Sequence, residues 1–301
     1  MSKAIPDLTR RALLIVNPIA GRKLIQRSLG AVVRKLMDGG YLATVAVTAA
    51  RGEARELVSR FGRDYDLVVC AGGDGTMNEC VSGMADAELH CPCSIIPCGS
   101  TNDFAVTHDL PSDILPAAEA IVSGRVRRYD IGCLEERCFL HHALFGAFTR
   151  LAYSTDQSQK NRLGFGAYVL DGLRELPNLK PIALAVTADG VREEGEYLFG
   201  AVSVNRYIVG IYTLPEELIA ADDGRLAAVL IKAPKSVQDW DALGRSLISG
   251  DTNNAMVKVL VGERIEVEAK EALEWSLDGE SSGPRKTVSF TARPGFLNVQ
   301  G

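Results

Sequence analysis

The sequence contains no uninterrupted apolar run of the ~18 residues that a membrane-spanning helix needs, because Arg, Asp, Gly or Pro breaks each candidate. Its first residues, MSKAIPDLTRR, contain no apolar core of the length found in secretion signals. Runs of Lys and Arg are also missing. We therefore expect a cytoplasmic protein that neither spans a membrane nor is held at one by a polybasic segment.

Positive charge is in deficit, because 33 Lys and Arg stand against 38 Asp and Glu, a net charge of −5. An acidic chain without basic runs is poorly suited to general binding of nucleic acid, so no nucleic-acid partner is expected. Apolar residues (47%) and charged residues (24%) are close to globular averages, which excludes a disordered or fibrous chain. Seven cysteines spread over 301 residues do not form a secreted disulfide framework, and buried thiols are expected.

The N-terminal part alternates short apolar runs with amphipathic stretches. Residues 12–16 (ALLIV) are continuously apolar, as expected of a strand buried on both faces, and 24–37 follow with apolar side chains at helical spacing. The same alternation predicts further strands at 42–47, 66–70 and 93–97, and further helices at 53–61, 76–84 and 115–123. This rhythm predicts an α/β domain with an open, mostly parallel sheet and helices on both faces.

After about residue 130 the pattern changes and strand-like runs dominate. They predict strands at 182–187, 197–204, 226–232, 256–261, 264–269 and 286–291, interrupted by one helix around 166–176. Residues 264–270 (RIEVEAK) alternate between apolar and polar, so one face of that strand is expected to be wet. The second half therefore predicts a mostly antiparallel β domain.

Three glycine-containing turns follow three of the predicted parallel strands. They are NPIAG at 17–21, GGDGT at 72–76 and GSTND at 99–103. Ligands of open α/β sheets bind outside the carboxyl ends of the strands, where backbone N–H groups of such turns can approach an anion. Helix starts expected at Thr76 and near Thr101 would favour phosphate further. A single glycine is explained by a tight turn, but three successive turns predict a phosphate site.

Asp74 lies inside the second turn, where its carboxylate would repel a phosphate. A divalent cation between the two groups removes the conflict, and Mg²⁺ is the usual ion with a nucleoside triphosphate. Neither a GxGxxG dinucleotide fingerprint nor a GxxxxGK[ST] P-loop occurs in these turns. The turns therefore predict a nucleotide site of another kind, with Asp74 toward the Mg²⁺.

Three strings together resemble the diacylglycerol kinase catalytic family: NPxAG at 17–21, GGDGTMNE at 72–79 and GSTNDFA at 99–105. This family includes bacterial diacylglycerol kinases and the sphingosine and ceramide kinases. GGDGT alone also occurs in NAD kinases and phosphofructokinases, whereas its pairing with a GSTNDFA-type string about twenty residues later is more specific. LDGE at 277–280 matches the family as well, so the resemblance covers essentially the whole chain.

The resemblance implies ATP- and Mg²⁺-dependent phosphorylation of a lipid hydroxyl, and it assigns roles residue by residue. Asp278 matches the proton acceptor, and Glu280 matches the acidic partner beside it. Asp74, Asp103 and Asp130 match acidic positions near the metal and the phosphates. The residues that match the nucleotide-binding positions are Asn17, Pro18, Ile19, Ala20, Gly21, Thr48, Gly72, Gly73, Asp74, Gly75, Thr76, Met77, Asn78, Glu79, Ser100, Asp103 and Asp130.

The string Asp222-Asp223-Gly224 resembles a turn that holds a structural Mg²⁺ in bacterial members of the family. Carried over, Asp223 would bind this ion together with the main-chain carbonyls of Ala220 and Arg225. Without the family, Asp-Gly is a strong hairpin signal. The string Asp278-Gly279-Glu280 likewise reads as a turn between two strands. Both alternatives stay open at the level of sequence.

The resemblance divides the chain into a nucleotide-binding α/β domain at 9–131 and a β-sandwich-like lipid-substrate domain at 132–285. The last strand, at about 286–300, either stays in the second domain or returns to the first. The helical segment at 164–176 either packs on the β domain or lines an acyl-chain groove. Val106 stands where the family often has Arg, which leaves room for an altered substrate.

The function expected is therefore a lipid kinase that converts diacylglycerol to phosphatidic acid and reaches its substrate peripherally at a membrane surface. Alternatives are a kinase of a sphingoid lipid or of NAD, and a non-catalytic lipid-binding protein on the same fold. The presence of Asp74 and Asp278 favours an active enzyme. The sequence leaves the oligomeric state open, a homodimer included.

Overall fold

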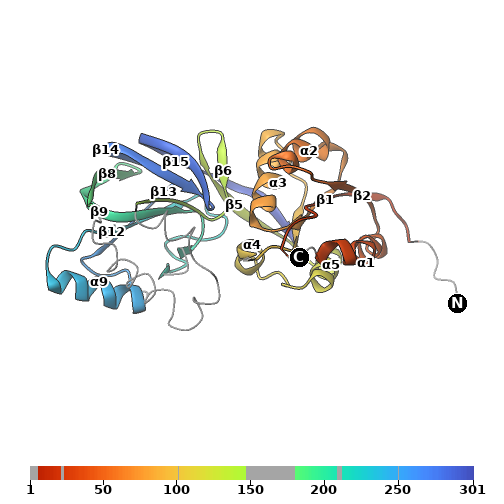
Figure 1. Ribbon diagram of the computed structural model, residues 1–301, viewed down its shortest axis with the longest axis horizontal. Coiled ribbons are helices and arrows are strands. Elements are labelled where there is room, and N and C mark those ends of the chain that lie inside the picture. The colour runs from red at the N-terminus through yellow and green to blue at the C-terminus, as the bar shows by residue number, and fades with distance from the viewer. Residues whose placement is uncertain (1–5, 22–23, 101, 147–179, 209–211, 250) are drawn as a thin grey trace. The chain divides into compact units, whose positions relative to one another are not determined.

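The computed structural model describes residues 6–21, 24–100, 102–146, 180–208, 212–249 and 251–301 (Figure 1). The chain divides into two compact units: unit 1 comprises Met1–Tyr129 and Phe296–Gly301, and unit 2 comprises Asp130–Gly295. Thr101 and the helix expected at 164–176 lie outside the described residues. Within the described residues, no helix combines the length and the apolar character needed to cross a membrane.

Unit 1 is built from alternating strands and helices. In chain order these are β1 (Arg10–Val16), α1 (Leu24–Asp38), β2 (Tyr41–Val47), α2 (Glu53–Phe61), β3 (Leu67–Gly72), α3 (Asp74–Asp86), β4 (Cys93–Pro97), α4 (Asp103–Thr107) and α5 (Ile114–Ser123). The strands lie in the order β4-β3-β1-β2, and all these pairs are parallel. The open parallel sheet predicted from the sequence is confirmed.

Both faces of this sheet are covered, which explains the continuous apolar runs of its strands. Leu14 of β1 belongs to a buried cluster with Ile25 and Leu36 of α1 and Ile121 of α5. Successive side chains alternate across a strand, so the buried Ile15 faces the opposite side. Figure 1 shows α1 and α5 on one side of the sheet and α2 and α3 on the other.

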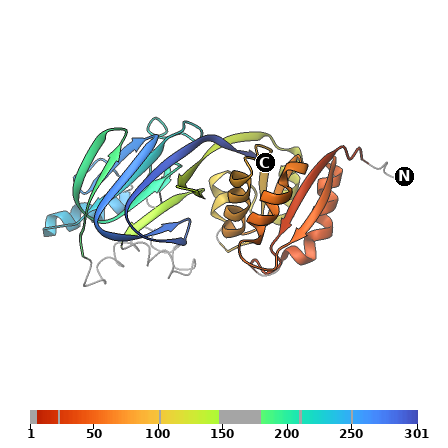
Figure 2. The same ribbon diagram turned by 90° about the horizontal axis from the view of Figure 1, so that it is seen from above.

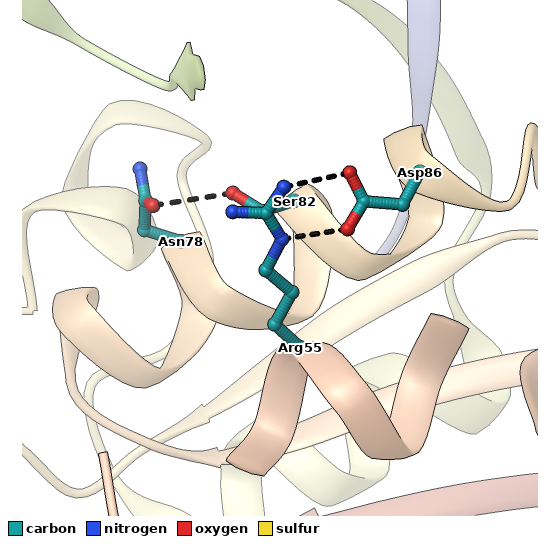
Figure 3. A network of polar contacts seen from close by, with 4 residues as sticks. All are labelled: Arg55, Asn78, Ser82 and Asp86. Atoms are coloured by element: carbon teal, nitrogen blue, oxygen red, sulfur yellow. Dashed lines mark hydrogen bonds and ion pairs between the residues drawn. The ribbon is translucent and has the colours of Figure 1, made fainter. Parts of the chain in front are cut away.

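Helices α2 and α3 approach each other closely. A Cβ atom on Gly83 of α3 would lie 2.4 Å from the carbonyl oxygen of Arg55 in α2, so a larger residue does not fit without movement. Arg55 Nε and Nη2 donate to the carboxylate of Asp86 at 2.6 and 2.7 Å, as Figure 3 shows. Next to this ion pair, Ser82 Oγ donates to Asn78 Oδ1 at 3.4 Å. The contact between the two helices therefore fixes the helix that carries Asn78.

Unit 2 is mostly antiparallel, as predicted. Its elements are β5 (Val126–Leu134), which begins in unit 1, then β6 (Arg137–Phe139), β7 (His142–Gly146), β8 (Ile182–Ala188), β9 (Val191–Ser203), β10 (Tyr207–Ile208), β11 (Tyr212–Thr213), β12 (Leu226–Lys232), α9 (Val237–Ser249), β13 (Val257–Gly262), β14 (Arg264–Leu277) and β15 (Glu280–Gln300). The strand order is β13-β12-β9-β7-β14-β15, and β8 pairs with both β9 and β14.

Strand β12 separates two apolar clusters of unit 2. Leu230 packs in the cluster that contains Phe145, Trp275 and Phe290. The rings of Phe145 and Trp275, and those of Trp275 and Phe290, have centroids 5.0 Å apart. Ile231, the next residue of β12, belongs instead to the cluster beneath α9. A strand buried on both faces must be apolar at every position, which is why the pattern predicts its bounds correctly.

The last strand is shared by both units. Its first part pairs with β14, and its end pairs in parallel with β4 through Val299 and Cys93. Figure 2 shows β15, in blue, leading to the C-terminus. Since Phe296–Gly301 belongs to unit 1, this strand returns to the sheet in which the chain begins.

Helix α9 lies where the sequence pattern predicts no helix. Ser236 Oγ accepts the N–H of Asp239, and Asp239 Oδ2 accepts the N–H of Ser236, both at 3.1 Å. This reciprocal capping is a helix-start signal that is readable in the sequence as Ser-x-x-Asp. Strands β5 to β7 are also additional to the prediction, and β9 begins at Val191 rather than at residue 197. The early part of β9 is polar and exposed, so it lacks the apolar alternation that marks a strand.

Candidate active site

The turn after β1 is held to the turn after β3 by Asn17. Its Nδ2 donates to Thr76 Oγ1 at 3.0 Å, and its backbone N–H donates to the carbonyl of Ala71 at 2.9 Å. The remaining side-chain atom, Oδ1, accepts the N–H of Ile19 at 3.1 Å. One side chain thus shapes its own turn and fastens it to the next. Ile19 projects outward, with 72% of its surface exposed.

Glycine lets all three turns approach one another. A Cβ atom on Gly73 would lie 3.0 Å from Gly99 Cα, and one on Gly99 would lie 2.6 Å from Gly73 Cα. In the first turn, Gly21 adopts φ +49°, and its Cβ would lie 2.2 Å from the carbonyl oxygen of Cys98. The structure therefore brings the turns after β1, β3 and β4 together at one edge of the sheet, as expected from the ends of parallel strands.

The side chain of Asp74 reaches the third turn. Its Oδ1 accepts the N–H of Phe104 at 2.9 Å. Asn102, in the left-handed region with φ 55°, precedes α4, and its Oδ1 accepts the N–H of Gly99 at 2.8 Å. The carboxylate of Asp74 therefore has a structural role in the second turn, because it holds the start of α4.

Helix α3 begins two residues earlier than predicted. The prediction of a start at Thr76 is wrong, because extended Gly73 (φ −103°, ψ −172°) is the N-cap and Asp74 is the first helical residue. A carboxylate in the first turn of a helix is favoured by the partial positive charge of its N-terminus. A Cβ atom added to Gly75 would meet no other atom within 4 Å, so the surroundings of this residue are open.

Other residues of the predicted nucleotide set support the turns from behind. Met77 is fully buried, and Thr48, also buried, bonds the carbonyl of Val16 through its N–H at 2.9 Å. Glu79 accepts the N–H groups of Gly52 (2.8 Å) and Ala54 (3.3 Å), which lie at the start of α2. Of the third turn, Ser100 and Asp103 are exposed. The set thus divides into supporting residues and residues open to a ligand.

In unit 2, Asp278 lies in the two-residue turn between β14 and β15. Asp278 and Gly279 adopt φ +44° and +89°, and Leu277 pairs with Glu280 across the turn. Asp278-Gly279-Glu280 therefore does form a turn between two strands, as its sequence predicts. Glu280 is half-buried at the first position of β15. The turn alone does not decide the role of the carboxylate.

Three backbone N–H groups hold that carboxylate. Oδ2 accepts the N–H of Leu140 at 2.5 Å, and Oδ1 accepts those of His141 and His142, each at 2.9 Å. The N–H of Asp278 in turn donates to the carbonyl of His142 at 2.9 Å. We call residues 140–142 the amide loop. It fixes both the position and the orientation of the Asp278 carboxylate, which the sequence pattern did not reveal.

Asp130 is bound to the turn formed by residues 222–224. Its Oδ2 accepts the N–H of Gly224 and its Oδ1 that of Gly295, both at 2.6 Å. Burial raises the pKa of Asp130, the negative charges of Asp223 and Asp222 raise it further, and the two N–H bonds oppose the change. The contacts that the structure shows for Asp130 lie within unit 2, beside the predicted Mg²⁺ site.

The turn at 222–224 is not a hairpin in the described structure, since β12 pairs with β9 and β13 and β11 pairs with β10. Both oxygens of Asp223 accept backbone N–H groups, from Ala220 at 2.8 Å and Arg225 at 3.0 Å. Across the described residues, no three His, Cys, Asp or Glu side chains are grouped to hold a metal ion. The contacts shown for the Asp223 carboxylate are with N–H groups, so the Mg²⁺ site with the carbonyls of Ala220 and Arg225 stays a prediction.

Comparison with known proteins covers both units. The family model of the diacylglycerol kinase catalytic domain matches residues 11–134, and that of the YegS C-terminal NAD kinase beta sandwich-like domain matches residues 145–301. A diacylglycerol kinase of Bacillus subtilis is 31% identical over 276 residues, which cover 91% of each chain. One of Staphylococcus haemolyticus is 33% identical over 222 residues, or 73% of this chain and 67% of the relative.

The same relationship extends to three dimensions. A crystal structure of a candidate diacylglycerol kinase from Bacillus anthracis matches 100% of this chain and 98% of its own, with a TM-score of 0.81 and 27% identity. The two-unit arrangement of an α/β catalytic domain and a β-sandwich-like domain, the motifs in the glycine turns and the relatives agree. The chain belongs to the diacylglycerol kinase family and is a lipid kinase.

Proposed function

We propose that this lipid kinase transfers the γ-phosphate of ATP to the free hydroxyl of diacylglycerol and yields phosphatidic acid. The observation that carries the proposal is the convergence of the three glycine turns, where Gly73 and Gly99 let two backbones meet. The names of the relatives support diacylglycerol as the acceptor.

On the nucleotide side, backbone N–H groups of the turns and the N-terminus of α3 would bind the phosphates. The exposed residues Ser100 and Asp103 would contact the nucleotide, whereas Met77 and Glu79 would keep the turns in place. Asp74 would hold the Mg²⁺ that accompanies ATP. When bound, this ion supplies positive charge that neutralises the phosphates.

On the acceptor side, Asp278 would remove the proton of the lipid hydroxyl as the oxygen attacks the γ-phosphorus. The bond between phosphorus and the bridging oxygen of ADP breaks, and ADP leaves. A general base acts only when it is held in the right orientation, and the amide loop provides this through three N–H groups. Glu280, two residues on, would be the acidic partner of Asp278.

The reaction is tested with γ-labelled ATP, Mg²⁺ and mixed micelles that contain diacylglycerol, monoacylglycerol, sphingosine or ceramide, with NAD as a separate aqueous acceptor. We expect label in phosphatidic acid. Label in another acceptor would replace diacylglycerol with that substrate. Binding of ATP without any labelled product would favour the non-catalytic alternative.

The role of Asp278 is tested by a matched pair of variants. Asp189 in the turn between β8 and β9 is its structural twin, because it also has φ +44°, precedes a glycine and accepts two backbone N–H groups, from Glu263 and Arg264. Asp278→Asn should lower kcat by about 10²–10⁴-fold, the usual contribution of a general base, with an unchanged dissociation constant for ATP. Asp189→Asn should leave kcat unchanged. Equal losses in both variants would reject Asp278 as the base.

A further inference from the structure

The side chain of Ser203 contacts the amide loop from the neighbouring strand. Ser203, at the end of β9, is completely buried, and its Oγ lies 3.1 Å from the carbonyl oxygen of His141. The N–H of Val204 donates to the same carbonyl at 3.2 Å. Ser203 and His142 are also direct partners in the pairing of β7 with β9.

That carbonyl belongs to the peptide group whose other end faces the candidate base. The peptide between His141 and His142 has the His141 carbonyl on one side and the His142 N–H on the other. The N–H donates to Asp278 Oδ1, and the carbonyl lies within hydrogen-bond distance of the Ser203 hydroxyl, which it shares with the carbonyl of Asn205. A planar peptide cannot turn at one end alone, so a bond to its carbonyl also fixes the direction of its N–H.

The remaining contacts of Ser203 determine its hydrogen-bond role. The N–H of Asn205 donates to Ser203 Oγ at 3.2 Å, and the Asn205 carbonyl lies 2.8 Å from it. His142 Nδ1 lies 3.1 Å from the same oxygen. A hydroxyl has one hydrogen, which the carbonyls of His141 (3.1 Å) and Asn205 (2.8 Å) share as a three-centre bond. No hydrogen is then left for His142 Nδ1, which must itself carry a proton and donate to the serine oxygen.

The protonation state of His142 agrees with this assignment. Desolvation and the neighbouring His141 lower the pKa of His142 to about 3, so the ring is neutral at physiological pH. A neutral ring with its proton on Nδ1 donates to Ser203 and adds no positive charge beside the amide loop. The loop then acts on Asp278 through its backbone N–H groups.

We propose that Ser203 is a positioning residue for phosphoryl transfer, which orients the Asp278 carboxylate through the peptide group between His141 and His142. The inference rests on the proposed role of Asp278 as the base. It assigns the serine a part in the reaction although its hydroxyl is buried and bonds to the peptide rather than to Asp278.

Ser203→Ala removes the hydroxyl and should lower kcat about tenfold, which corresponds to about 1.4 kcal/mol and to the loss of one hydrogen bond. The dissociation constant for ATP should not change. Ser203→Cys, which keeps the size and has a weak S–H donor, should fall between alanine and wild type. Ser203→Thr restores the hydroxyl and should recover most of the activity. Should the alanine variant fail to fold, the cysteine and threonine variants decide.

A matched control is Ser246, a buried serine of α9 whose Oγ contacts Tyr212 Oη (3.0 Å), the carbonyl of Asp251 (2.5 Å) and Asn254 Nδ2 (2.8 Å). Ser246→Ala should lower the melting temperature about as much as Ser203→Ala and leave kcat unchanged. If both serines reduce kcat equally, the effect is one of general stability, and the positioning role is overturned.

A double-mutant cycle separates this inference from the proposed function. In the Asp278→Asn background, Ser203→Ala should cause no further loss of the residual rate, because the group it orients is gone. An unchanged tenfold loss there would show that Ser203 acts by another route and would overturn the inference. If Asp278→Asn alone turns over like wild type, the base assignment fails first, and the role of Ser203 falls with it.

Discussion

Gly99→Ala is expected to separate two of the three glycine turns. The added Cβ would lie 2.6 Å from Gly73 Cα and 2.9 Å from Asn102 Oδ1. Two carbon atoms normally stay about 3.5–4.0 Å apart, so the turns must move apart by roughly 1 Å. An overpacked site of this kind costs about 1–3 kcal/mol of the free energy of unfolding.

The same displacement acts on the nucleotide. A hydrogen bond from a backbone N–H to a phosphate is lost when its length grows by about 1 Å, and a bond to a charged group contributes about 1.5–3 kcal/mol. Loss of a single such bond raises the dissociation constant of ATP by about 10–100-fold. Urea denaturation measures the first effect, and titration calorimetry with ATP measures the second.

Two further glycine variants show whether a loss of ATP affinity comes from the turns themselves or from a general loss of stability. Gly83→Ala places its Cβ 2.4 Å from the carbonyl of Arg55, so it should destabilise the α2–α3 contact (Figure 3) and lower ATP affinity much less than Gly99→Ala. A Cβ atom on Gly30 of α1 would meet nothing within 4 Å, and Gly30→Ala should stabilise the helix by about 0.5–1 kcal/mol. Wild-type ATP affinity in Gly99→Ala, or equal losses of affinity in Gly83→Ala, would refute the assignment of the phosphate site to these turns.

Two other predictions concern stability. Mg²⁺ should raise the melting temperature of the wild type, and a chelator should reverse this rise. Asp223→Ala should show no rise, because the carboxylate ligand is missing. An equal rise in both proteins would show that Asp223 does not bind the ion. His142 has a folded pKa of about 3 against an ordinary value of 6.5, so the unfolded chain binds the extra proton between these values. The free energy of unfolding should therefore fall as the pH drops below 6.5, by up to about 1.4 kcal/mol per pH unit, and His142→Asn should show a shallower fall in urea titrations at pH 4.5–7. An identical pH dependence in the two proteins would contradict the neutral state of His142.

Patterns of apolar residues predict the elements that are buried on both faces. The strands at Cys93–Pro97 and Leu226–Lys232 have the predicted bounds, and so does the amphipathic helix at Glu53–Phe61, which buries one face only. Strands with an exposed face are predicted only in part, because the exposed half of β9 is mostly charged and forms ion pairs at the surface, such as Arg192 with Glu194. In such a stretch the charged side chains pair at the surface, and apolar residues do not recur at every second position as they do in a half-buried strand.

Contacts between distant segments are the part of the site that the sequence conceals. The string at 72–79 shows that phosphate chemistry is expected, but it does not show that Glu79 is bound to the start of α2 or that Asp74 holds Phe104. These carboxylates carry structural tasks as well as the predicted ones. Their substitution should therefore lower the stability of the fold as well as the ATP affinity that the proposed function predicts.

The two Asp-Gly turns of unit 2 show why a local pattern cannot assign the base. Asp189 and Asp278 have the same φ of +44°, and each is followed by a glycine with φ near +88°. The carboxylate of Asp189 accepts two N–H groups, from Glu263 and Arg264 where β13 leads into β14. That of Asp278 accepts three from the amide loop, more than 130 residues earlier in the chain. The turn positions the backbone in both places. What distinguishes Asp278 is a rigid set of donors, fixed in turn by Ser203, that only the tertiary fold brings to it.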